Sequence, residues 1–70
     1  MTESNDTKRR RELIRSRMFI SRISQSDIAR REGVTRGLVC NVIAGRRTNR
    51  AVQVALADVV GMEPTELWEN

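Results

Sequence analysis

The sequence predicts a small all-α domain of five helices, and three observations support this prediction. Apolar residues recur at helical spacing, β-branched residues do not alternate with polar ones, and glycines fall between the apolar stripes. At 70 residues the chain is one domain at most. The core must come from helix packing, because one cysteine cannot form a disulfide within the chain and there is no histidine to help hold a zinc ion.

The first segment divides into an arm and a helix. Residues 1–7 are polar and predict a flexible N-terminal arm, which leaves residues 8–70 as the folded domain. The first helix is expected from about Lys8 to Ile20 or Ser21. Its apolar residues are expected to form roughly one face; they are Leu13, Ile14, Met18 and Phe19.

Two short helices joined by a tight turn are predicted next. Ser24 is a good N-cap, and Asp27 lies three residues on, as in a capping box. Gly33 is placed to end this second helix in the left-handed conformation. Thr35 then caps a third helix, which Gly45 closes. The apolar stripe of the third helix consists of Leu38, Val39, Val42 and Ile43.

The last third of the chain predicts two more helices. The fourth is expected from about Arg50 to Val60, with alanines that permit close approach of a neighbour. Gly61 ends it, and Pro64 is placed at the first position of a short last helix that carries Leu67 and Trp68. The apolar face of the fourth helix consists of Val52, Leu56, Val59 and Val60.

The charge is unevenly distributed along the chain. Residues 7–50 carry all 13 basic groups and three acids, a net +10, whereas residues 51–70 carry four acids and no base. A basic body of this kind predicts binding to a polyanion such as nucleic acid, and the alternative is a solvated basic surface.

The same sequence predicts a cytoplasmic, nucleoid-associated protein that does not contact a membrane. No apolar run reaches the ~18 residues of a membrane span. The start of the chain lacks the apolar stretch of a signal peptide. A lone cysteine suits a reducing compartment.

The most specific pattern lies in residues 24–45. Two short helices are joined by a glycine turn, and the small Ala29 lies four residues before Gly33, where the second helix of the pair crosses close over the first. Helix-turn-helix units have this shape. The strings "ISQSDIAR", "NVIAGRR" and "ALADVVGMEPTELW" follow in order along the chain.

With these strings, residues from about 10 to 68 resemble the phage-repressor and Cro type of helix-turn-helix domain, the XRE family. The ending also resembles that of Ner-like phage regulators. The resemblance implies a compact five-helix lambda-repressor-like fold. In that fold residues 24–45 are the helix-turn-helix unit, whose second helix enters the major groove of double-stranded DNA.

The resemblance also implies roles for individual residues. Gln25 would bind a backbone phosphate, with Ser24 as a possible second phosphate contact. Arg36 can pair with guanine, and Asn41 can pair with adenine or hold a phosphate. The full set expected at the bases is Thr35, Arg36, Gly37, Cys40 and Asn41. The loop after the third helix would lie along phosphates or the minor groove; it contains Arg46, Arg47, Thr48, Asn49 and Arg50.

Several of these assignments leave alternatives open. Gly37 stands where the family often has a long polar side chain, and it either lets the backbone approach the bases or makes no contact. Cys40 either packs against a thymine methyl group or fills space. The basic start of the first helix either touches phosphates that flank the site or is a solvated face; its candidates are Arg9, Arg10 and Arg11.

The leading hypothesis is a sequence-specific transcription regulator of phage or mobile-element origin, a repressor that binds an inverted repeat as a homodimer. Pairing about a two-fold axis doubles the number of base contacts. The candidate dimer surface consists of Met62, Leu67 and Trp68, although Leu67 and Trp68 could instead complete the core of the monomer.

Two other functions are consistent with the same sequence. One is an excision or transposition accessory factor that bends DNA at tandem sites, and the other is an antitoxin-like protein-binding module. We do not expect an enzyme, a cofactor, a metal or a small-molecule ligand. The sequence has no histidine, no nucleophile–base pair and no glycine-rich phosphate loop.

Overall fold

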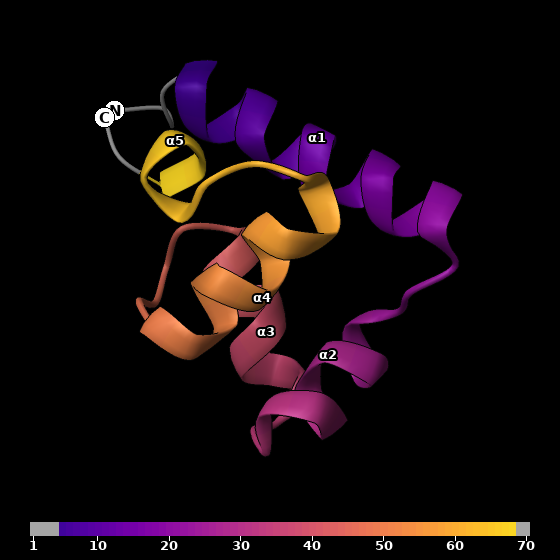
Figure 1. Ribbon diagram of the computed structural model, residues 1–70. Coiled ribbons are helices and arrows are strands. Elements are labelled where there is room, and N and C mark those ends of the chain that lie inside the picture. The colour runs from indigo at the N-terminus through magenta and orange to yellow at the C-terminus, as the bar shows by residue number, and fades with distance from the viewer. Residues whose placement is uncertain (1–4, 69–70) are drawn as a thin grey trace.

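The computed structural model describes residues 5–68, which form helices and the turns between them. The helices are α1 (Asn5–Ser21), α2 (Gln25–Glu32), α3 (Arg36–Ile43), α4 (Arg50–Val60) and α5 (Pro64–Trp68) (Figure 1). Residues 5–68 contain no strand, so the predicted all-α class with five helices is confirmed. α1 begins earlier than expected, at Asn5 rather than near Lys8. Residues 1–4 of the predicted arm, and residues 69 and 70, lie outside the described residues.

Helix α4 lies in the middle of the arrangement. It packs against α1 on one side, against α2 and α3 on the other, and against α5 beyond its end (Figure 1). Val52, Leu56 and Ala57 on α4 have no exposed surface. Because alanine side chains are short, the neighbouring helices can approach the α4 backbone closely.

The core is built from all five helices and is apolar, with no buried polar or charged residue among residues 7–68. Burial of apolar surface contributes about 25 cal/mol for each Å² removed from water. The core residues are Ile14, Met18, Ile28, Ala29, Val39, Val42, Ile43, Val52, Ala55, Leu56, Ala57, Val60 and Leu67. None of the helices within residues 5–68 is long and apolar enough to cross a membrane.

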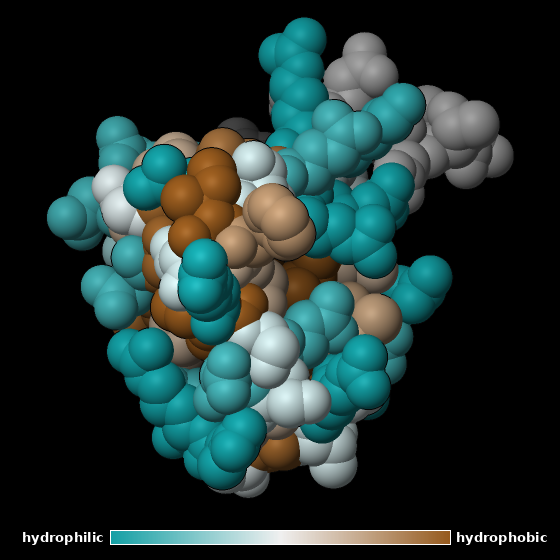
Figure 2. Space-filling model, turned by 90° about the vertical axis from the view of Figure 1, so that its right-hand side faces the viewer, coloured by the Kyte–Doolittle hydropathy of each residue, from teal (hydrophilic) through white to brown (hydrophobic). Residues whose placement is uncertain are grey.

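The predicted apolar face of α1 is wrong at two of its four positions. Ile14 and Met18 are buried, but Leu13 is 39% exposed and Phe19 is 85% exposed. Successive residues on a helix are turned by about 100°, so Leu13 and Phe19 are rotated away from the buried pair in opposite directions. Figure 2 looks onto the side of the molecule where α1 ends and shows apolar surface bordered by hydrophilic side chains.

The turn between α2 and α3 depends on the backbone of Gly33. Its φ is +69°, which confirms the predicted left-handed end of α2. A Cβ atom at this position would meet no other atom within 4 Å. The need for glycine is therefore conformational, since a side chain would strain the backbone even though space is available.

Helix α5 closes the fold against α1 and α4. The Trp68 indole Nε1 donates a hydrogen bond to the Gln53 carbonyl oxygen at 2.8 Å. The Arg10 guanidinium lies 5.0 Å from the centre of the Trp68 ring, in cation–π geometry. Leu67 is only 5% exposed. Leu67 thus belongs to the core of the monomer and is not available to the predicted dimer surface, while Met62 and Trp68 are half-buried.

Two substitutions in α1 test the division between its buried and exposed faces. Ile14→Val removes one methyl group from a fully buried side chain, and we expect it to lower the free energy of unfolding by about 0.5–1.5 kcal/mol. Phe19→Ala removes a whole ring from an exposed side chain, and we expect a change within about 0.5 kcal/mol. Urea unfolding followed by circular dichroism measures both. A larger loss for Phe19→Ala than for Ile14→Val would contradict this burial pattern.

Candidate nucleic-acid interface

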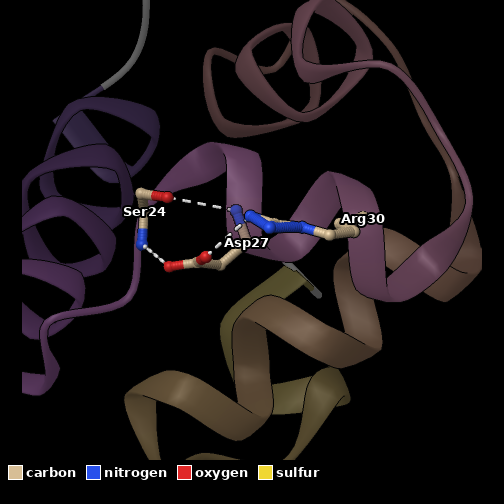
Figure 3. A network of polar contacts seen from close by, with 3 residues as sticks. All are labelled: Ser24, Asp27 and Arg30. Carbon is tan, nitrogen blue, oxygen red and sulfur yellow. Dashed lines mark hydrogen bonds and ion pairs between the residues drawn. The ribbon is translucent and has the colours of Figure 1, made fainter.

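The start of α2 is fixed by a reciprocal pair of hydrogen bonds. The Asp27 backbone N–H donates to Ser24 Oγ at 3.1 Å, and the Ser24 backbone N–H donates to Asp27 Oδ2 at 2.8 Å (Figure 3). The predicted capping box is thereby confirmed. It places Gln25 at the first position of α2, where backbone N–H groups and the helix dipole favour an anion.

The Asp27 carboxylate has a second partner in Arg30, whose Nη2 lies 3.1 Å from Asp27 Oδ1 (Figure 3). The hydrogen bond from the Ser24 backbone is the main cause that lowers the pKa of Asp27, with the Ser24 side chain and Arg30 acting in the same direction. The capping carboxylate is therefore charged throughout the neutral range.

Helix α3 has one buried face and one exposed face. Val39, Val42 and Ile43 are buried, whereas Arg36, Gly37 and Cys40 are exposed. Thr35 is exposed too, and its Oγ1 accepts a hydrogen bond from the Leu38 N–H at 3.1 Å, so it caps α3 as predicted. Packing within the fold does not require glycine at position 37. A Cβ atom there would come near only Thr35 Oγ1, at 4.0 Å, which is an ordinary van der Waals distance.

An open hollow of about 270 Å³ lies beside this exposed face. Arg11 and Arg15 of α1 line it together with Gln25 of α2. The remaining lining residues come from α3 and the loop that follows; they are Cys40, Ile43, Ala44 and Arg46. Three arginines line the hollow and no acidic residue is in the described lining, so the hollow favours an anion.

The three arginines at the start of α1 have different surroundings. Arg9 is exposed. Arg10 lies against α5, where its Nη1 is 3.5 Å from the Leu67 carbonyl oxygen as well as over the Trp68 ring. Arg11 lines the hollow. Arg10 therefore contacts α5 in this structure, and its role as a flanking phosphate contact stays a prediction. Arg15 was missed, because only the placement of α1 beside α3 brings it to the hollow.

The loop between α3 and α4 is held at both ends. At its start, Arg46 Nη1 donates to Asn41 Oδ1 at 3.2 Å, and the Arg46 backbone N–H donates to the Asn41 carbonyl oxygen at 2.9 Å. At its end, Asn49 Oδ1 accepts from the Val52 N–H at 3.1 Å and caps α4. The Asn49 side chain is thus used within the fold, a role that the prediction of a phosphate contact did not include.

Exposed polar groups remain along the rest of this loop and the start of α4. Arg47, Thr48 and Arg50 are all exposed, as is Arg46. We group these exposed residues of the loop and of the start of α4 with the polar residues that line the hollow, and call the set the α3 border; it consists of Arg11, Arg15, Gln25, Arg46, Arg47, Thr48 and Arg50.

We compared the chain with known proteins and found no relative. No family model, curated protein or solved structure matches the chain. The geometry of the α3 border is therefore the basis on which the function is proposed.

The lowered pKa of Asp27 gives a stability change with a defined direction in pH. Because the folded-state pKa lies below the unfolded value of about 3.9, the charged carboxylate stabilises the fold above that pH. The stabilisation is lost as pH falls through the folded-state pKa. We expect Asp27→Asn to lower the melting temperature near neutral pH, and we expect the gap from the unmodified protein to close in acid. Thermal unfolding across this pH range measures the gap, and a gap that stays constant contradicts the assignment.

Proposed function

We propose that this protein is a sequence-specific DNA-binding transcription regulator of the helix-turn-helix type. The observation that carries the proposal is the position of the three-arginine hollow beside the exposed face of α3. A helix that is to enter the major groove needs an exposed face and basic groups at its sides, because the phosphates border the groove. Cys40 belongs to both the exposed face and the hollow.

The exposed face of α3 supplies the candidate base contacts. The major groove of B-DNA is about 12 Å wide and admits an α-helix. Arg36 is exposed in the first turn of α3, and its guanidinium matches the O6 and N7 acceptors of guanine. Thr35 offers a methyl group for thymine, although its hydroxyl oxygen is used in the cap. Gly37, which the fold itself does not require, supports a close approach of the α3 backbone to the bases.

The α3 border supplies the candidate phosphate contacts. Gln25 lies at the N-terminus of α2, where the Ser24–Asp27 box leaves the adjoining N–H groups in place for an anion. Arg11, Arg15 and Arg46 add positive charge next to Gln25 in the same hollow. Phosphate contacts carry no base information, so this half of the interface would fix the orientation of α3 in the groove.

A homodimer on an inverted repeat, acting as a repressor, belongs to the same proposal. One copy of α3 contacts only a few base pairs, and two copies about a two-fold axis give half-sites one helical turn apart. Of the predicted dimer surface, Met62 and Trp68 remain partly exposed.

Selection of binding sites from random double-stranded DNA, followed by footprinting, tests the proposal directly. We expect enrichment of one short palindrome and a single footprint over it. If the selection enriches no sequence, and the protein binds random DNA only as weakly as an unrelated basic protein does, sequence-specific binding is excluded.

Two arginine substitutions separate base contacts from phosphate contacts. Arg36→Ala should cost about 1–3 kcal/mol on the selected site and relax the preference at one base pair. Arg47→Ala should weaken selected and random DNA alike and reduce the slope of log K against log salt by about 0.9. Arg31→Ala is the control, because Arg31 pairs with Asp58 of α4 at 3.5 Å. Equal losses on both DNAs for Arg36→Ala would refute its assignment to a base.

A further inference from the structure

We infer that Asn41 is a positioning residue that holds the Arg46 guanidinium toward the DNA backbone, and that it does not contact a base. This inference deepens the proposed function and depends on it for its DNA-binding part. It differs from both roles that the sequence resemblance implied for Asn41, which were pairing with adenine and holding a phosphate.

Asn41 holds Arg46 at two points. Its side-chain oxygen accepts from Arg46 Nη1 at 3.2 Å, and its backbone oxygen accepts from the Arg46 N–H at 2.9 Å. The same backbone oxygen lies 3.3 Å from the Arg47 nitrogen. Both the position of the Arg46 backbone and the direction of its side chain therefore depend on Asn41.

The chemistry of the amide explains why this contact competes with base recognition. To pair with adenine, asparagine presents its oxygen to N6 and its nitrogen to N7 at the same time. In Asn41 the Arg46 guanidinium takes one of the two lone pairs of this oxygen and turns the amide toward the loop, away from the orientation that pairing with adenine needs. Asn41 is also half-buried, unlike Arg36, Gly37 and Cys40 on the same helix.

The contact prepares Arg46 for an anion. A guanidinium has five N–H donors, and the bond to Asn41 uses one of them. Arg46 lines the hollow with Arg11 and Arg15, so its charge is held in a cluster of like charge before any DNA arrives. Holding a long side chain in place in advance lowers the entropy lost on binding and so raises affinity for a phosphate group.

A double-mutant cycle on DNA tests the coupling. We expect Asn41→Ala to weaken binding by about threefold to tenfold, equally on the selected site and on random DNA. In an Arg46→Ala background the same substitution should have no further effect. A changed preference at one base pair in Asn41→Ala, or losses that add fully in the double variant, would overturn the inference.

A measurement without DNA separates this inference from the proposed function. Rotation of the Arg46 guanidinium, measured by NMR on the free protein, should be faster in Asn41→Ala and in the similarly sized Asn41→Leu. Asn41→Asp keeps the acceptor oxygen and should keep the rotation slow, and Arg47 serves as the internal control. An unchanged Arg46 rotation in both Asn41→Ala and Asn41→Leu overturns the positioning role. Failure of the protein to bind any duplex would instead exclude the proposed function.

Discussion

The apolar face of α4 is the contact on which the arrangement of the other helices depends, because α1, α2, α3 and α5 all pack against it. Val52 and Leu56 on this face are fully buried, and Ala55 and Ala57 beside them keep the inter-helix distances short. No disulfide within the chain can take over this role, since Cys40 is its one cysteine. The hollow follows from the same packing, because α1 and α2 both pack on α4, α3 packs mainly on α2, and residues of α1, α2 and α3 line the hollow.

Several polar side chains within residues 5–68 cap the starts of helices, and the candidate interface lies next to these caps. Ser24 and Asp27 cap α2, and Asn49 caps α4. These caps satisfy backbone N–H groups that would otherwise lack partners in the first turn. Because Asn41 and Asn49 hold the two ends of the loop after α3, its arginines are displayed from a fixed backbone.

How much could be predicted from the sequence depends on how far apart in the sequence the interacting residues lie. The box at Ser24 and the left-handed Gly33 are local, and both were predicted correctly. The faces of α1 are set by α4, about 40 residues later, and so the exposure of Phe19 was not foreseen. Arg15 was missed for the same reason, since its place in the hollow requires α3. The bond between Asn41 and Arg46 crosses the end of a helix, where periodicity no longer indicates which residues meet.

The contact between Arg10 and Trp68 joins the first helix to the last across 58 positions of the chain. Ribosomes add about 5–20 residues per second, so several seconds separate the synthesis of these two side chains. During that interval α1 has neither the α4 surface that covers Ile14 nor the indole that receives Arg10. The growing chain therefore exposes the basic segment of α1 with Ile14 and Met18 uncovered. Folding to the final arrangement is a late event, completed only after the last helix has emerged from the ribosome.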